Sequence, residues 1–238
     1  MEDIKFSTKL YPFSLPLFNS GYFDLSIKKP ILIISGDNGV GKSTLLEIIA
    51  GSCGFNISGG SKSHLYNGQK NDVKAILKNI NFSWKIKVNN GFFMRADSFN
   101  QFAIYLDELA KFDRRSYKPY GGKSLNEQSH GESFLSLFEN RFGTRGIYIL
   151  DEPEAALSPQ KILSFMVMIN ELSKTGDAQF IISTHSPMLM AMPDAQFIYI
   201  KDSELIEMDY KETEHFQITK SFLNNPERML KYLLKDEN

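Results

Sequence analysis

Gly36-Asp37-Asn38-Gly39-Val40-Gly41-Lys42-Ser43-Thr44 is the stretch that decides the fold of this chain. It lies between an apolar run at residues 31–34 and a run with helical spacing at residues 45–49. The glycines allow the backbone to curl with its N–H groups pointing inward, so that phosphates can lie at the N-terminus of a helix. A strand, such a loop and a helix in succession are typical of the Walker A motif. We therefore expect all nine residues to bind a nucleoside triphosphate.

Two side chains of this loop have distinct expected roles. The Lys42 ammonium should reach the β- and γ-phosphates as a point charge. The Ser43 hydroxyl is placed to complete the octahedral oxygen shell of Mg²⁺. The sequence thus predicts a nucleotide together with a magnesium ion.

A second apolar strand, Ile147-Tyr148-Ile149-Leu150, ends in the carboxylates Asp151 and Glu152. This pattern, downstream of a Walker A motif, is typical of Walker B. We expect Asp151 to hold Mg²⁺ through its water shell. We expect Glu152 to be the base, or the group that orients water, for attack on the γ-phosphate.

The next expected strand, residues 180–183, is followed by Thr184 and His185. His185 should therefore lie at the same edge of a parallel sheet as Asp151 and Glu152. We predict that it is a polar sensor of the γ-phosphate that helps to align Glu152 and the water. Position alone assigns no role to the other histidines, His64, His130 and His215.

Residues 129–133, Ser-His-Gly-Glu-Ser, precede a helical apolar run. Ser129 with Glu132 three residues later is a capping box, so in isolation the segment predicts only a capped helix start. In the order Walker A, residues 129–133, Walker B, residues 156–159 and His185, however, it resembles the signature motif of ATP-binding-cassette (ABC) ATPases.

The resemblance extends over residues 10–200 and is to the SMC/RecF-like branch rather than to transporter ATPases. Ser158 and Ser186-Pro187 stand where transporter ATPases usually have Asp. Residues 91–99, 127–133 and 213–216 together resemble a family of small bacterial predicted AAA/ABC ATPases. The family's biological role is poorly known, so the resemblance names no pathway.

The resemblance implies ATP and Mg²⁺ as ligands and a head-to-tail homodimer formed on ATP binding. In that dimer, Ser129 and Gly131 would supply a hydroxyl and a backbone N–H to a γ-phosphate bound by Lys42 of a second copy. The expected function is ATP hydrolysis that acts on an unknown protein or nucleic-acid client, in a DNA-related or defence-related role. The alternatives are the ATPase subunit of an ABC transporter and a nucleotide-dependent switch in an anti-phage or toxin system.

The alternation of strands and helices predicts an α/β fold, the P-loop head of an ABC ATPase, with a mostly parallel sheet flanked by helices. We expect an antiparallel edge sheet in residues 6–25 and one domain over residues 1–238. A lid or helical lobe is expected over residues 52–128, with a strand near residues 82–88, and helices over residues 211–238.

Composition limits the class of protein. The 238 residues are 42% apolar and 13% aromatic, enough for a full core, and a net charge of −1 gives no overall basic field for nucleic acid. A single cysteine, Cys53, excludes an internal disulfide and fits a reducing compartment. The N-terminal residues do not form a secretory signal, and no apolar run is long enough for a membrane helix. We expect a cytoplasmic protein without membrane insertion.

Three assignments remain open at this stage. The Q-loop residue, which links the Mg²⁺ site to the lid, is Asp97 or Gln101. Phe13 lies at the distance before Lys42 where an adenine-stacking ring is expected, yet it fits a core aromatic equally well. A cluster of basic residues before the signature suits either a solvated loop or contacts with a nucleic-acid phosphate backbone. This basic cluster consists of Lys111, Arg114, Arg115, Lys118 and Lys123.

Overall fold

Strands in the order β2-β3-β4-β1-β5-β6 form one sheet in the computed structural model, which describes residues 11–19, 24–64, 77, 80–85, 88–143, 145–175 and 178–234. All neighbouring pairs are parallel except β5 and β6, which are antiparallel. The strands are β1 (Ile31–Gly36), β2 (Gly91–Arg95), β3 (Gly146–Asp151), β4 (Ala178–Ser183), β5 (Gln196–Lys201) and β6 (Glu204–Glu207). The predicted mostly parallel α/β sheet of a P-loop ATPase is confirmed.

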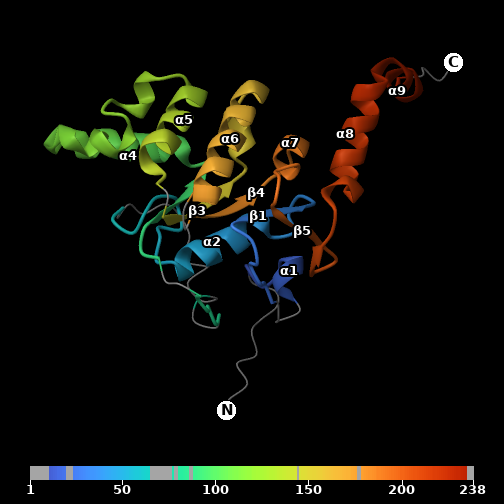
Figure 1. The fold of residues 1–238 in the computed structure, drawn as a ribbon, viewed down its shortest axis with the longest axis horizontal. Helices are drawn as coiled ribbons and strands as arrows, with labels where there is room; N and C mark the ends of the chain where they lie inside the picture. The colour runs from blue at the N-terminus through green and yellow to red at the C-terminus, as the bar shows by residue number, and fades with distance from the viewer. Residues whose placement is uncertain are drawn as a thin grey trace, which may run out of the picture.

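Helices cover both faces of the sheet (Figure 1). One face carries α2 (Lys42–Ser52) and the short α1 (Pro16–Asn19). The opposite face carries α4 (Phe99–Phe112), α5 (His130–Arg141), α6 (Pro159–Thr175) and α7 (Pro187–Met190). Short 3₁₀ helices connect these elements at Arg114–Tyr120, Leu125–Glu127, Pro153–Ala156 and Tyr210–Glu212.

The parallel strands β1 to β5 are buried on both faces along most of their length, which is why they are largely hydrophobic runs in the sequence. In β3, Tyr148 and Leu150 pack in the core under α4–α7, whereas Ile147 and Ile149 pack in the core under α2. Since successive side chains of a strand point to opposite faces, one strand contributes to both cores. All six residues of β3 are buried.

The register of the sheet aligns the carboxyl ends of its central strands. Arg95, the last residue of β2, is paired with Asp151 of β3, and Asp151 is paired with Ser183 of β4. Ile34 of β1 is paired with Ser183 as well, so the loop that follows β1 begins at the same edge. Four strand ends therefore deliver polar residues to one place.

Two expectations about strands differ from the structure. Residues 11–19 and 24–30 contain α1 and turns but no strand, so the antiparallel edge sheet expected in residues 6–25 is not found in the described part of that segment. Leu17 and Phe18 of α1 instead pack into the core beside α2. Residues 80–85 and 88–90 are also without a strand, although the apolar alternation there predicted one. Alternation supplies a face to bury but not a neighbouring strand to pair with.

The expected lobe at residues 52–128 is divided between the sheet and its helical cover. Residues 91–95 are the edge strand β2, whereas α4 and the two following 3₁₀ helices pack above it. Asn56–His64 run beside β2, where Gly60 and Phe93 exchange backbone hydrogen bonds of 2.6 and 3.0 Å. The chain between Walker A and the signature therefore contributes to the main sheet.

The C-terminal region contains a hairpin and two helices. β5 and β6 form the antiparallel hairpin, and α8 (Glu214–Asn224) and α9 (Pro226–Leu233) lie within residues 211–238, where helices were expected. Figure 1 shows α8 and α9 extending away from the sheet, with only the start of α8 close to it. In the part of the chain that the structure describes, no helix combines the length and apolar character needed to cross a bilayer.

Candidate functional site

The loop between β1 and α2 has the backbone of a phosphate cradle. Gly36, Gly39 and Gly41 have φ angles of 150°, 80° and 109°, a region that L side chains rarely adopt. A Cβ at Gly36 would also lie 2.7 Å from the carbonyl oxygen of Ile200. Both facts explain why glycine is required here, as the Walker A motif predicted.

The ammonium of Lys42 lies over this loop. Its Nζ donates hydrogen bonds to the carbonyl oxygens of Gly36, at 2.9 Å, and Asp37, at 2.8 Å. Burial lowers the pKa of this ammonium, and the charges of Glu152 and Asp151 oppose that shift. The Tyr199 hydroxyl donates to Asp37 Oδ1 at 2.9 Å and so ties the loop to β5.

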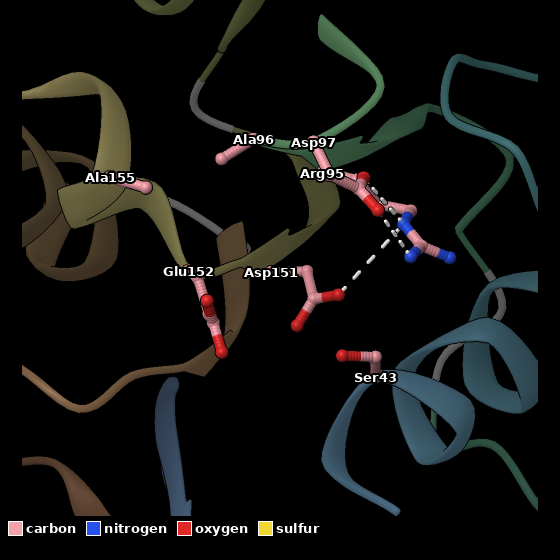
Figure 2. Close-up of a pocket in the computed structure, with 7 residues that line it drawn as sticks. All are labelled: Ser43, Arg95, Ala96, Asp97, Asp151, Glu152 and Ala155. Carbon is pink, nitrogen blue, oxygen red and sulfur yellow. Dashed lines mark hydrogen bonds and ion pairs between the residues drawn. The ribbon is translucent and has the colours of Figure 1, made fainter. Parts of the chain in front are cut away.

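A pocket of about 260 Å³ lies beside the loop (Figure 2). Figure 2 shows Asp151 and Glu152 at the end of β3, opposite Ser43 at the start of α2 and Arg95 at the end of β2. The remaining lining residues are Ala96, Asp97 and Ala155. The predicted Mg²⁺ residues, Ser43 and Asp151, thus face the same space.

Asp151 places a carboxyl group in a buried position. It is 5% exposed, and its Oδ1 accepts a hydrogen bond of 2.5 Å from the Ser183 hydroxyl. Burial raises the pKa of Asp151, while the hydrogen bond from Ser183 and the charge of Arg95 act in the opposite direction. A buried carboxylate of this kind is stabilised by a cation, so the residue fits a magnesium ion.

Arg95 is the site residue that sequence analysis missed. Its guanidinium pairs with Glu47, with Asp97 at 2.8 Å and with Asp151 at 3.9 Å. Asp97, one of the two Q-loop candidates, lines the pocket and pairs with Arg95. Gln101, the other candidate, is exposed on α4 and is not among the lining residues. The available signal in the sequence was a cation at the end of an apolar strand, in a fold whose strand ends form the site.

Glu152 has an unusual backbone. Its φ and ψ are 50° and 53°, the left-handed conformation, and its N–H donates to the carbonyl of Ser183 at 3.1 Å. Strain of this kind in a non-glycine residue is concentrated at functional sites. Burial raises the pKa of Glu152, and the charges of Asp151 and Glu154 raise it further. A carboxylate with a raised pKa is suited to accept a proton.

His185 lies beside Glu152, as the sequence predicted. Its Nε2 is 3.6 Å from Glu152 Oε1. Glu154 Oε1 holds the loop that carries the ring, because it accepts hydrogen bonds of 2.7 Å from both the Thr184 hydroxyl and the His185 N–H. Burial, together with the charges of Lys42 and His215, lowers the pKa of His185 to about 4.

The signature residues lie elsewhere. Ser129 begins α5 in the predicted capping box: its N–H and its hydroxyl donate to Glu132 Oε2 at 3.1 and 2.5 Å. A Cβ at Gly131 would lie 3.1 Å from the carbonyl of Ala156 and 3.0 Å from Lys161 Nζ, so the signature packs on residues 156–161. Neither Ser129 nor Gly131 lines the pocket of its own chain.

Other candidates are also placed. Phe13 packs against the core under α2, whereas the Tyr11 hydroxyl lies 2.9 Å from Thr44 Oγ1 in the phosphate loop. His64 is a core histidine, hydrogen-bonded to Ser61 and Tyr120. In the basic cluster, Lys111 pairs with Glu108 and Arg115 pairs with Asp113.

Comparison with known families assigns the chain. The model of the family described as "AAA domain, putative AbiEii toxin, Type IV TA system" matches residues 73–191, half of the chain. The chain belongs to this AAA-domain family. It is an ABC-type P-loop ATPase in fold and motif order, and members of this family are typically ATPases.

Individual relatives of this AAA-domain protein are distant. The ribose import ATP-binding protein RbsA of Oceanobacillus iheyensis is 24% identical over 205 residues, which cover 80% of this chain. The chain spans only 41% of the length of RbsA.

Similar solved structures include an ATP-binding cassette and an SMC head domain. One is a dimeric, post-hydrolysis state of the ATP-binding cassette MJ0796 bound to ADP and Pi, with a TM-score of 0.44, 16% identity, and coverage of 79% of this chain and 89% of that chain. Another is the SMC head domain from Thermotoga maritima, with a TM-score of 0.42, 17% identity, and coverage of 77% and 92%.

Proposed function

We propose that this protein binds Mg²⁺-ATP at the pocket between β1, β2 and β3 and hydrolyses the β–γ phosphoanhydride. The observation that carries the proposal is the convergence of the Lys42 ammonium with the Asp151 and Glu152 carboxylates at one sheet edge. A phosphate chain needs the Lys42 ammonium, its metal ion needs the Asp151 carboxylate, and an attacking water needs the Glu152 carboxylate.

The residues have separate roles in this proposal. The N–H groups of residues 36–44 and the Lys42 ammonium bind the phosphates, and Ser43 and Asp151 hold Mg²⁺, which neutralises phosphate charge. Glu152 accepts a proton from the water that attacks the γ-phosphorus, and His185 orients Glu152 and the γ-phosphate. The raised pKa of Glu152 and its 3.6 Å approach to His185 support these roles.

Two substitutions test the proposal. Lys42→Ala should abolish ATP binding in calorimetry with Mg²⁺ present, because the β- and γ-phosphate charges lose their counter-ion. Glu152→Gln should bind ATP normally and lose at least about 100-fold in turnover, because it keeps the shape and loses the base. Lys174→Ala and Glu139→Gln change exposed residues on α6 and α5 and are the matched controls. Normal ATP affinity in Lys42→Ala would contradict the phosphate-loop assignment, and near-normal turnover in Glu152→Gln would contradict the choice of base.

We further propose that two copies close head to tail on ATP. Ser129 and the Gly131 N–H lie at the start of α5 and do not line the pocket beside the phosphate loop of their own chain, so we assign them to a nucleotide held by another copy. For this contact the Ser129 hydroxyl must leave Glu132 Oε2. A ligand that touches both chains only in the dimer favours the dimer by its differential affinity.

Light scattering tests the dimer. Glu152→Gln should shift from monomer to dimer with saturating Mg²⁺-ATP, and adding Ser129→Arg should block the shift while monomer ATP binding stays intact. Asn140→Arg, exposed at the far end of the same helix, adds the same charge and should leave the shift unchanged. If the Glu152→Gln protein stays monomeric with ATP, the head-to-tail dimer is contradicted, and residues 129–133 serve only as a helix cap.

We propose that the client is a protein or a nucleic acid. We place the ATPase in the cytoplasm, and we treat residues 1–238 as one domain. The family description, which names a toxin of a type IV toxin–antitoxin system, favours a defence-related switch as the cellular role. We rank a transporter motor lower because Ser158 and Ser186 replace acidic residues that transporter ATPases usually carry. Co-purification with the products of the neighbouring genes distinguishes the roles: a permease supports the motor, and an antitoxin-like partner supports the switch.

A further inference from the structure

A second histidine lies directly behind His185. His215 Nε2 is 3.1 Å from His185 Nδ1, and the ring centroids are 4.8 Å apart. His215 is in the first turn of α8, in the segment Thr213-Glu214-His215-Phe216, and no step of the proposed hydrolysis uses it. Helix α8 therefore contacts the residue that faces Glu152.

The first turn of α8 is built to hold this position. Thr213 is 2% exposed; its hydroxyl accepts from the Phe216 N–H at 3.3 Å and donates to the Tyr210 carbonyl at 2.7 Å. The Tyr210 and Phe216 rings pack edge to face, 5.2 Å apart. Neither α8 nor α9 contains a buried residue. The buried N-cap residue Thr213 therefore anchors the start of α8, next to His215.

The contact between the rings determines where the protons lie. A hydrogen bond between two ring nitrogens contains one hydrogen, so one ring donates and the other accepts. Burial, with the charges of Lys42 and His215, lowers the pKa of His185 to about 4, so at neutral pH its ring carries a single proton. If His215 donates, that proton must be on His185 Nε2. If His185 donates, its Nε2 is a bare lone pair.

The surroundings favour the first arrangement. His185 Nε2 is 3.6 Å from the carboxylate oxygen Oε1 of Glu152. An N–H at Nε2 is attracted to that oxygen and to a γ-phosphate, whereas a lone pair would be repelled by both. A hydrogen bond that His215 Nε2–H donates to His185 Nδ1 is therefore the arrangement that suits the surroundings of both nitrogens of the His185 ring.

We infer that His215 is a positioning residue that fixes the ring and the Nε2–H tautomer of His185, so that His185 presents a hydrogen-bond donor to Glu152 and the γ-phosphate. This inference rests on the proposed ATPase function. It also gives residues 213–216 a purpose, and it makes the anchored start of α8 part of the nucleotide site.

Three substitutions of His215 separate the chemistry of the contact from its volume. His215→Gln keeps an N–H donor close to the place of Nε2. His215→Glu offers only acceptors and reverses the hydrogen bond. His215→Met fills the space without a strong donor or acceptor. Gln217→Met, on the same helix and exposed, is the matched control.

Turnover and ring ¹⁵N spectra are the two measurements. We expect His215→Met and His215→Glu to lose about tenfold or more in kcat, as happens when the hydrogen-bond partner that orients a functional histidine is lost, with the Kd for ATP unchanged. His215→Gln and Gln217→Met should stay within about threefold of wild type, on the same reasoning. The spectra, recorded without nucleotide and assigned with His185→Gln, should show Nε2–H of His185 in wild type and Nδ1–H in His215→Glu.

The outcomes are separable. Nδ1–H of His185 in wild type, or wild-type turnover in both His215→Met and His215→Glu, would overturn the inference and leave the ATPase proposal standing. A wild-type protein that hydrolyses no ATP would overturn the ATPase proposal, while the spectra would still decide the tautomer. If His215→Met fails to fold, the Gln and Glu variants decide between donor and acceptor.

Discussion

Replacing Arg95 by Gln should destabilise the protein strongly, because its guanidinium balances carboxylates that are shielded from water. The side chains of Arg95 and its partner Glu47 are 18% and 6% exposed. Removing one partner of a buried ion pair typically costs about 3–5 kcal/mol, since the other charge loses its counter-ion. With a urea m-value of about 3 kcal/mol/M, the unfolding midpoint of Arg95→Gln should fall by about 1–1.7 M.

A double-mutant cycle tests this reasoning. Adding Glu47→Gln to Arg95→Gln removes the buried charge and should recover about 2 kcal/mol or more, which is in the range of coupling between contacting residues. Asp97, whose side chain is 66% exposed, contacts the same guanidinium, so Asp97→Asn is the control and should cost less than about 1 kcal/mol. The reasoning fails if Arg95→Gln unfolds at the wild-type urea concentration, or if the losses from Arg95→Gln and Glu47→Gln simply add.

Two further predictions concern buried groups outside the pocket. Burial lowers the pKa of His64 to about 4 from an unfolded value of 6.5, so protonation favours the unfolded state as pH falls. The stability from this group is complete above pH 6.5 and is lost between pH 6.5 and 4, by about 3 kcal/mol; urea unfolding of His64→Gln should show a smaller fall over that range than wild type. Burial raises the pKa of the Cys53 thiol to about 12, so we expect iodoacetamide to leave the native protein unmodified at pH 8 and to alkylate Cys53 in urea. Mass spectrometry measures this, and rapid labelling of native protein would contradict the burial of Cys53.

The parts of the site that could be predicted from sequence share a cause. Lys42, Asp151 and His185 each follow an apolar strand, and the strands are parallel, so their carboxyl ends lie at one edge. The sequence pattern therefore gave both the residue types and their convergence. The pairing of Ser129 with Glu132 was predictable for a similar reason, because a capping box is a local contact.

The parts of the site and fold that could not be predicted depend on contacts between residues that are far apart in the sequence. Arg95 ends a strand in no recognised motif, and only the register with β3 places it beside Asp151. His215 is 30 residues beyond His185, on a helix that contains no buried residue. Leu17 and Phe18 lie on the short helix α1 and pack into the core beside α2. The short apolar runs around them had instead suggested strands.

Lys42 and Arg95, two cations at the same edge of the sheet, have different partners, and this difference separates ATP binding from stability. Lys42 donates to the carbonyls of Gly36 and Asp37, neutral groups that lose little when the ammonium turns toward a phosphate. Arg95 is bound to carboxylates that need a cation whether or not a nucleotide is present. We therefore expect Lys42→Ala to lose ATP affinity with little loss of stability, and Arg95→Gln to lose stability first. Since Mg²⁺ would supply a cation to Asp151 but not to Glu47, Mg²⁺-ATP should restore only part of the stability lost in Arg95→Gln.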